Sequence, residues 1–365
     1  MPRLVLALLL AAAVPAAAAQ RPLGVADPPA PGAIDASRRT AITAAVEAAS
    51  PAVVSINVIE VRQVRVRDPF ADFFGGVPSR VYEQQVQGLG SGFIVSSDGY
   101  IVTNDHVAGN AARITVAFAD GRTLDARLVG SDAETDIALL KVEPPAPLPF
   151  LAFDPEHDPV VGEWAIALGN PFGLFEATEP TVTVGVVSAI VRDFPAQQGR
   201  TFRDLIQTDA AINSGNSGGP LVNAAGRVMG MNTFIYSQSG GSVGLGFAVP
   251  AWRIQRVIEE LRATGTVDRA FYTGLNVLTP RAAQRLGLDP SRGIIVSSVD
   301  AGSPADRAGL RAYDLIVTIA GEAVRTNEDV QQRLVDNRPG DTVELGVVRD
   351  GAATTARLTL GTTAG

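Results

Sequence analysis

Residues 207–220 read QTDAAINSGNSGGP, and this stretch decides how the rest of the chain is interpreted. At its centre is Ser217, whose hydroxyl would be a weak nucleophile without a base beside it. The surrounding glycines permit a tight backbone turn and the close approach of a substrate. In such a turn the backbone N–H groups of Gly215 and Ser217 are the natural donors to an oxyanion. The stretch therefore predicts a nucleophilic serine with an oxyanion hole, and an ordinary Gly/Ser turn is the alternative.

The base can be sought among only two histidines. His106 follows the apolar run Tyr100–Thr103, so it is expected at the end of a strand, facing a cleft. His157 lies among acids and prolines, which is typical of a solvated loop. We therefore expect His106 to serve as the base, with a purely structural histidine as the alternative.

The third group of such a site is a carboxylate that orients the imidazole. Asp136 opens the apolar run 137–142, where burial would be unfavourable without a partner. Asp132 and Asp105 are alternatives in more polar surroundings, and capping of a turn is the structural alternative. The chain order His106, Asp136, Ser217 is that of chymotrypsin rather than that of subtilisin or the α/β-hydrolases.

From residue 52 to residue 250, short β-rich runs alternate with turn signals such as Asp98–Gly99 and Asp120–Gly121. Many short strands at this spacing predict a barrel or a sandwich. Helices are expected at 40–49 and 251–263, the second ended by Gly265. The expected strands are 53–58, 92–96, 101–103, 114–118, 137–142, 184–190, 221–222, 228–232 and 246–249.

Composition and the N-terminus bear on partners and compartment. A formal net charge of -8 and no basic stripe argue against nucleic-acid binding, and the lack of cysteine excludes disulfides. Arg3 precedes an apolar run that ends in alanines, which predicts a signal peptide over residues 1–19. An uncleaved inner-membrane anchor facing the periplasm is the alternative. Residues 20–50 are expected to form an N-terminal segment.

From about Ser50 onward the chain resembles the HtrA (Deg) family of serine endopeptidases. The resemblance implies a mainly β fold, with a chymotrypsin-like double β-barrel over residues 51–265 and an α+β PDZ domain over 268–362. It further implies an exported, periplasmic enzyme of protein quality control and the stress response, homotrimeric or larger, with no cofactor and no metal. The matching stretches are 90–94, 103–107, 136–142, 169–173 and 207–220.

The resemblance also bears on specificity. The base of the primary pocket in this fold lies six residues before the nucleophile, at Ala211, where an acid would favour Arg or Lys. A small apolar pocket is therefore expected, with cleavage after Val, Ala or Ile in unfolded protein substrates. The expected substrate-binding residues are Ala211, Ile212, Asn216, Phe234, Ile235 and Tyr236.

The C-terminal module resembles a PDZ domain through residues 293–296, 302–310 and 314–317, with Ala312–Tyr313 in place of the usual Pro-Gly. Such domains bind peptide C-termini by adding a strand to a sheet edge. The expected carboxylate-binding loop comprises Tyr272, Thr273, Gly274 and Leu275. A domain kept only for packing or assembly is the alternative.

Three further segments have competing interpretations. Residues 88–92 resemble a phosphate loop but lack a following lysine, so a β-hairpin is expected. Residues 244–247 match a PDZ carboxylate loop but are assigned to the last protease strand. The phenylalanines of the loop 68–76 either bind a ligand or pack on their own domain. For the whole protein, a weakly proteolytic chaperone or peptide-binding scaffold and a non-proteolytic esterase are the alternative functions.

Overall fold

The computed structural model describes residues 38–66, 80–154, 158–170, 179–197, 200–213, 215–235 and 242–362. The predicted signal peptide (residues 1–19), His157, Tyr236 and the loop 68–76 lie outside these residues. The described residues from Ala41 onward belong to one compact unit. In the part of the chain that the structure describes, no helix is both long enough and apolar enough to cross a membrane.

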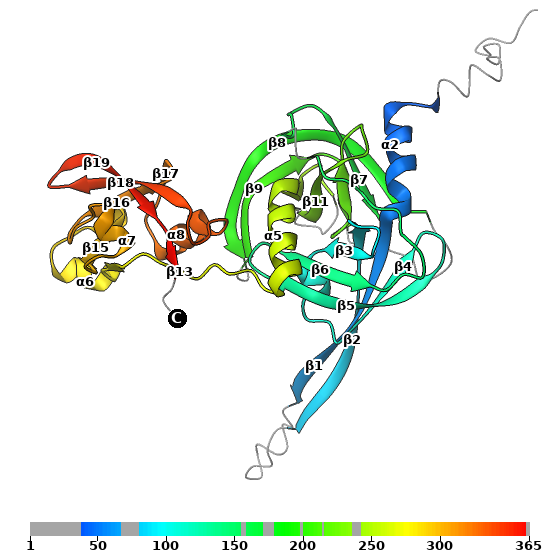
Figure 1. Cartoon of the computed structure of the whole chain (residues 1–365), viewed down its shortest axis with the longest axis horizontal. Coiled ribbons are helices and arrows are strands. Elements are labelled where there is room, and N and C mark those ends of the chain that lie inside the picture. Colours follow the sequence, from blue (N-terminus) through cyan, green and yellow to red (C-terminus); the bar gives the residue numbers. More distant parts are fainter. Residues whose placement is uncertain are drawn as a thin grey trace, which may run out of the picture. The chain divides into compact units, whose positions relative to one another are not determined.

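Two closed six-stranded barrels follow one another in the chain (Figure 1). The first has the strand order β1-β2-β3-β6-β5-β4 and the second β10-β11-β12-β9-β8-β7. The strands of the first are β1 (Val53–Val66), β2 (Arg80–Ile94), β3 (Tyr100–Thr103), β4 (Arg113–Phe118), β5 (Thr123–Asp132) and β6 (Ile137–Val142). Those of the second are β7 (Trp164–Gly169), β8 (Thr181–Gln197), β9 (Arg200–Thr208), β10 (Pro220–Val222), β11 (Val228–Ile235) and β12 (Gly246–Pro250).

Two helices pack small and branched apolar side chains into the main core of the protease barrels. Helix α2 (Ala41–Ala49) continues into the short helix η1 (Ser50–Ala52), and Ala45 and Ala49 are buried in the main core. Helix α5 (Ala251–Thr264) buries Ile254, Val257 and Leu261 in the same core and ends at Gly265 in the left-handed conformation. Both helices and the mainly β fold agree with the predictions from sequence.

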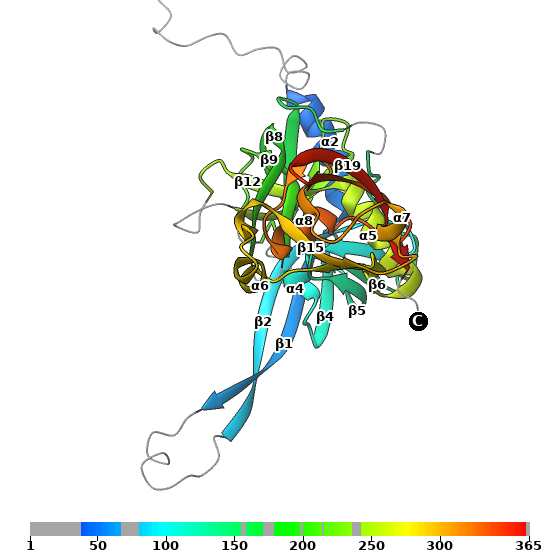
Figure 2. The same ribbon diagram turned by 90° about the vertical axis from the view of Figure 1, so that its left-hand side faces the viewer.

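The strands β1 and β2 are far longer than expected. They pair without interruption from Val53↔Phe93 to Val66↔Arg80, and Figure 2 shows them leaving the barrel as a two-stranded ribbon. The glycine-rich run 88–92 is therefore part of a strand, as predicted. Residues 246–250 form β12, so the neighbouring GLGF stretch belongs to the protease barrel, also as predicted.

The C-terminal module is a sheet of order β14-β15-β16-β18-β19 with β17 paired to β16, flanked by helices. Its own core is lined by residues such as Val296, Ile319, Leu345 and Leu358. Its strands are β13 (Phe271–Tyr272), β14 (Leu275–Val277), β15 (Ile294–Val299), β16 (Leu315–Ile319), β17 (Glu322–Ala323), β18 (Thr342–Arg349), β19 (Ala352–Thr359) and β20 (Gly361–Thr362). Its helices are α6 (Pro280–Arg285), η2 (Pro290–Arg292), α7 (Pro304–Arg307) and α8 (Asn327–Leu334).

The turn at Ala312–Tyr313, which replaces the usual Pro-Gly, places a residue other than glycine in the left-handed backbone conformation. Tyr313 has φ +69°, in the left-handed region that glycine usually occupies. The next residue, Asp314, is buried and accepts two bonds from Arg349, each 2.7 Å long. The substitution therefore leaves the fold intact at the expense of local strain.

Candidate active site

Adjacent strands bring the imidazole and the carboxylate together. Because β3 and β6 pair with Thr103 opposite Ala138, the residues just beyond these strand ends lie side by side. His106 stands in the single-turn helix α4 (Asp105–Ala108), directly after β3, and Asp136 immediately precedes β6. His106 Nδ1 is 2.8 Å from Asp136 Oδ2 and 3.0 Å from Oδ1. The backbone N–H of His106 also donates to Oδ1, at 3.0 Å.

Asp136 is buried, and its hydrogen bonds compensate for the loss of water. Thr233 donates its hydroxyl to Asp136 Oδ2 at 2.8 Å, and Asn104 Nδ2 donates to the Asp136 carbonyl at 3.0 Å. Burial alone would raise the pKa of Asp136, but the hydrogen bonds and charge of His106, together with Thr233, lower it below its ordinary value. The ionised carboxylate accepts a hydrogen bond from Nδ1–H, and Nε2 of His106 is then the nitrogen that can take a proton.

Ser217 lies in a turn that only glycines permit. Gly218 has φ +84°, and a Cβ there would lie 2.2 Å from the Ser91 carbonyl oxygen. The Ser217 carbonyl accepts the N–H of Ser91 at 2.9 Å, and Gly218 N–H donates to Asn232 at 2.8 Å. The turn between β9 and β10 is thereby attached to a strand of the first barrel and to a strand of the second.

His106, Ser217 and Gly215 line one cavity of about 240 Å³. The Ser217 hydroxyl donates to the carbonyl of Thr233 at 3.2 Å rather than to His106. Rotation about the Cα–Cβ bond is the movement that would turn Oγ toward the imidazole. The carboxylate and imidazole come from the first barrel and the hydroxyl from the second, as the resemblance implies.

Gly215, which is expected to donate to the oxyanion, has a positive φ that favours glycine. Gly215 has φ +106° and lines the cavity together with Ser217. Its carbonyl accepts the hydroxyl of Ser91, and that hydroxyl also accepts the N–H of Asn170 at 2.8 Å. Asn216 N–H donates to Asn213 at 3.0 Å, which closes a tight turn immediately before the serine.

Two residues of this site were not found from the sequence. Thr233 donates to Asp136 and, through its carbonyl, accepts from Ser217, yet it lies in a β-strand with no motif around it. Ser91 holds the Gly215 carbonyl and the Ser217 turn, and it does lie in one of the family-matching stretches. That stretch was the available signal for Ser91, whereas Thr233 carries none.

The ring of His106 is hydrogen-bonded to Asp136 and not to Asp132 or Asp105, the alternative carboxylates. Asp132 accepts from Thr135 and from Arg269, whose two terminal nitrogens each approach at 2.6 Å. Asp105 is buried in α4, and its carbonyl accepts Gly109 N–H at 2.7 Å. Among the described residues, no group of three or more His, Asp or Glu side chains could hold a metal ion.

The expected specificity residues are placed only in part. Ala211 is half-buried, and its carbonyl accepts from Thr183 at 2.8 Å and from the Asn216 amide at 3.4 Å. Ile212 is fully buried in the core of the second barrel. Phe234 and Ile235 belong to β11, but their side chains lie outside the described part, as does Tyr236. Their role in substrate binding stays a prediction.

The PDZ module has a cavity of about 490 Å³ between β14 and α8. Thr273 and Leu275 of the predicted loop line it, opposite Val330 and Leu334 of the helix. Gly274 has φ +71°, and a Cβ there would lie 2.1 Å from the Ser303 side chain. Tyr272 is directed to Asp300, to which its hydroxyl donates at 2.8 Å. Two of the four predicted residues thus border the groove.

Comparison with known proteins agrees with this geometry. A trypsin-like peptidase domain matches residues 90–231, and a PDZ domain matches residues 274–360. A probable periplasmic serine endoprotease, DegP-like, from Ectopseudomonas mendocina is 38% identical over 340 residues, covering 88% of this chain and 70% of the relative. The chain belongs to the HtrA family of DegP-like serine endoproteases.

Other HtrA proteins show the same relationship. A probable periplasmic serine endoprotease, DegP-like, from Rhizobium meliloti is 42% identical over 275 residues, and this chain spans only about half (53%) of its length. The structure of the HtrA-type protease AlgW with a decapeptide has 37% identity and a TM-score of 0.61, covering 89% of this chain and 99% of that one. A serine endoprotease from Yersinia pestis has 32% identity and a TM-score of 0.56, with coverage of 89% and 99%.

Proposed function

We propose that this protein is an exported serine endopeptidase that degrades unfolded or misfolded proteins. The observation that carries the proposal is the shared cavity of His106 and Ser217, with the imidazole bonded to buried Asp136. Family membership supports the same activity. The relatives from Rhizobium meliloti and Ectopseudomonas mendocina are named as periplasmic proteins, which favours export to that compartment.

The reaction follows from the roles of the three groups. Ser217 Oγ attacks the carbonyl carbon of the scissile bond while His106 Nε2 takes its proton. Asp136 stabilises the imidazolium, and the backbone N–H groups of Gly215 and Ser217 stabilise the oxyanion. His106 then protonates the leaving amine, which breaks the C–N bond and leaves an acyl-enzyme. Water, deprotonated by His106, hydrolyses the acyl-enzyme and restores the serine.

The substrates are unfolded chains, because the small apolar side chains that suit the expected pocket are buried in folded proteins. The PDZ module recruits or senses peptide C-termini, which would add a strand beside β14 over the apolar groove. The homotrimer or larger assembly implied by the family is part of the same proposal, and light scattering on the purified full chain tests it.

Casein digestion tests the activity. We expect wild type to degrade casein and Ser217→Ala to lose more than about 10⁴-fold of the rate. Digestion by both preparations would refute the nucleophile, and digestion by neither would favour a chaperone or scaffold. Mass spectrometry after treatment with a fluorophosphonate identifies the modified serine and, in the same spectrum, whether residues 1–19 have been removed or remain as an anchor.

A further inference from the structure

Asn104 stands directly before α4, the helix that contains His106, but its side chain does not cap that helix. Its backbone has φ -75° and ψ 148°, the extended conformation of an N-cap residue, and no helix N–H bonds to its side chain. Asparagine is favoured at this position because its side-chain oxygen usually accepts such an N–H. Here the buried Oδ1 atom has no hydrogen-bond partner among the described residues. The side chain therefore forgoes a contact that would stabilise the helix.

The amide nitrogen of Asn104 donates instead to Asp136 and Thr233. Nδ2 is 3.0 Å from the carbonyl oxygen of Asp136 and 3.3 Å from Thr233 Oγ1. A carbonyl oxygen can only accept, so the nitrogen of the amide, and not its oxygen, must face Asp136. The orientation of the Asn104 side chain is thus set by Asp136 rather than by α4.

The contact with Thr233 determines where the hydroxyl proton goes. A threonine hydroxyl carries one proton and can accept at the same oxygen. Because Asn104 donates to Thr233 Oγ1, the hydroxyl proton is directed to Asp136 Oδ2, 2.8 Å away. Without the amide the hydroxyl would be free to rotate. Asp136 would then lose a donor at the oxygen that is nearest to His106 Nδ1.

The contact with the Asp136 carbonyl holds an unfavourable backbone conformation. Asp136 has φ +59°, in the left-handed region that residues with a Cβ rarely adopt. In this conformation its carboxylate accepts both the backbone N–H of His106, at 3.0 Å, and the ring Nδ1–H. Strain of this kind persists only where neighbouring contacts fix it, and it is frequent at functional sites. The 3.0 Å bond from Asn104 is one of the contacts that fix it here.

We propose that Asn104 is a positioning residue, which holds Asp136 by its carbonyl and directs the proton of Thr233 to its carboxylate. This inference rests on the proposed peptidase function. Asn104 is fully buried and is not among the residues that line the cavity of Ser217, so it acts through Asp136 and Thr233. The proposal also accounts for the Oδ1 atom without a partner, because the orientation that serves both acceptors of Nδ2 turns this oxygen away from the helix.

Peptide hydrolysis by two Asn104 variants tests the proposal. Asn104→Leu removes both donors with little change in size, and Asn104→Asp keeps the shape but presents an acceptor to the Asp136 carbonyl. We expect kcat to fall by about 10- to 100-fold in both variants, because a slightly misplaced base slows proton transfer steeply. KM should stay within about twofold of wild type, since the surface that binds substrate is unchanged. Urea unfolding shows that each variant is folded, and Asn104→Asp decides the test if Asn104→Leu is not.

A double-mutant cycle with Thr233→Val tests whether Asn104 acts through the hydroxyl. Once the hydroxyl is removed, the amide has only the Asp136 carbonyl left to hold. The loss of kcat caused by Asn104→Leu should therefore be at least about threefold smaller in the Thr233→Val background than in wild type. Losses that simply multiply would show that the two side chains act independently, and would overturn the proposal.

The NMR signal of the His106 Nδ1–H proton separates positioning from a general loss of stability. The chain has two histidines, so isotopic labelling of histidine observes only two rings, and His157→Gln assigns them. In wild type the proton bonded to Asp136 should exchange slowly with water. In Asn104→Leu it should exchange faster, because the carboxylate that holds it is less firmly placed.

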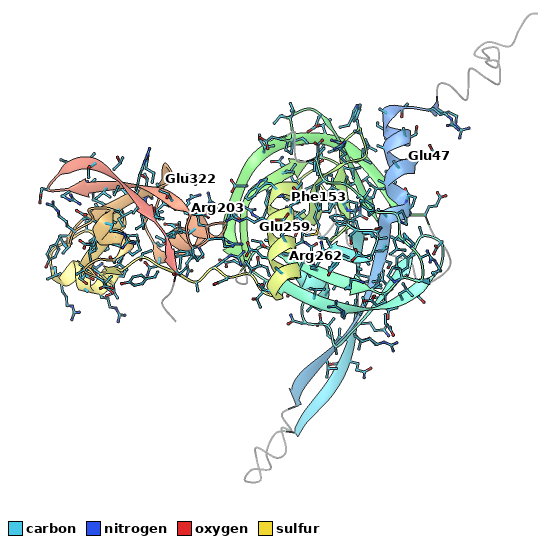
Figure 3. The ribbon with its side chains drawn as sticks, in the orientation of Figure 1. Glu47, Phe153, Arg203, Glu259, Arg262 and Glu322 are labelled. Atoms are coloured by element: carbon cyan, nitrogen blue, oxygen red, sulfur yellow. The ribbon has the colours of Figure 1, made fainter. Side chains whose placement is uncertain are left out.

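Two control variants match the two substitutions. Asn223→Leu makes the same change at an asparagine that donates to Asp154 at 2.8 Å, in the turn after β10. Arg262→Gln changes the net charge by the same amount as Asn104→Asp, at an exposed side chain of α5 (Figure 3). Both controls should keep the His106 signal and a kcat within about twofold of wild type.

The outcomes distinguish this proposal from the peptidase assignment. Hydrolysis that depends on Ser217, with kcat within about twofold of wild type in both Asn104 variants, overturns the role of Asn104 and leaves the peptidase intact. A change confined to KM, or an equal loss of kcat in Asn223→Leu, overturns it as well. Absence of any Ser217-dependent hydrolysis by wild type refutes the peptidase assignment itself, and the Asn104 proposal with it.

Discussion

Replacing Thr233 by valine tests whether this residue positions Asp136, the carboxylate proposed to orient His106. The substitution keeps the branched shape and the backbone carbonyl that accepts from Ser217. It removes the hydroxyl that donates to Asp136 Oδ2 at 2.8 Å and can accept from Asn104 at 3.3 Å. Only 2% of Asp136 is exposed, so water cannot readily replace the lost donor.

The expected magnitude follows from the remaining partners of the carboxylate. Asp136 keeps the Nδ1–H and backbone N–H of His106 but loses a bond worth about 1.5–3 kcal/mol to a charged group. We expect the free energy of unfolding of the protease domain to fall by about that amount. A less firmly oriented imidazole should lower kcat/KM by about tenfold, equivalent to roughly 1.4 kcal/mol of barrier.

The effect of Thr233→Val on stability should depend on pH in a definite direction. Because the pKa of Asp136 is lowered in the folded protein, its contribution to stability is present above the unfolded value and is lost as pH falls through the folded value. Thr233→Val removes one of the causes of that lowering. The stability difference between wild type and variant should therefore be full at pH 7 and shrink below about pH 3.8, the ordinary value for an aspartate.

The assay compares peptide hydrolysis and urea unfolding for wild type, Thr233→Val and Thr233→Ser. Serine keeps the hydroxyl, so Thr233→Ser should retain most of the activity. If Thr233→Val hydrolyses peptides within twofold of wild type, or if Thr233→Ser loses as much as Thr233→Val, the hydroxyl does not position Asp136 and the reasoning is refuted.

Three other substitutions probe the turn, the core and the strained backbone. Gly218→Ala forces a Cβ against the Ser91 carbonyl and should lower casein hydrolysis by more than about 100-fold; near-normal activity would contradict the tight fit. Leu139→Ala removes a buried side chain of β6 and should lower the free energy of unfolding by about 2–5 kcal/mol, measured in urea. Tyr313→Gly relieves a positive φ at an exposed side chain and should stabilise the PDZ domain by about 1 kcal/mol, seen as a higher melting temperature; a lower one would show that the ring packs usefully.

Most strands with strong apolar patterns were predicted, although the apolar strand β7 was missed together with more polar strands. The run 137–142 becomes β6 with the predicted bounds, because all six residues are buried. Strand β5 was missed, since its first half alternates between exposed and half-buried residues and resembles a loop in composition. Strand β9 begins Arg-Thr-Phe-Arg-Asp, and its pairing with β8 and β12 overrides weak local preference. In such strands, pairing partners distant in the chain decide the structure.

The residues of the candidate site also fall into those that the sequence predicted and those that it did not. The histidine, the serine and the carboxylate could be selected from the sequence because there were few candidates. The chain has two histidines, one Gly-Asn-Ser-Gly-Gly turn and one acid directly before a strongly apolar strand. The residues that hold them, Thr233 and Ser91, have ordinary side chains in ordinary strands. Their roles arise from contacts across 97 and 124 positions of the chain, to Asp136 and Gly215 respectively. The short stretch 90–94 marks Ser91 but does not indicate its partner, and no short stretch marks Thr233.

Thr233 connects the two barrels at the point where the chemistry requires them to meet. Its hydroxyl donates to the first-barrel carboxylate, and its carbonyl accepts from the second-barrel serine. A small shift of β11 would therefore change the position of Ser217 relative to His106 without unfolding either barrel. Because proton transfer needs the two groups within hydrogen-bond reach, activity should respond to such shifts more steeply than stability does. A movement of β11 or of the Ser217 turn would then be enough to change activity, while Asp136 and His106 stay hydrogen-bonded to each other.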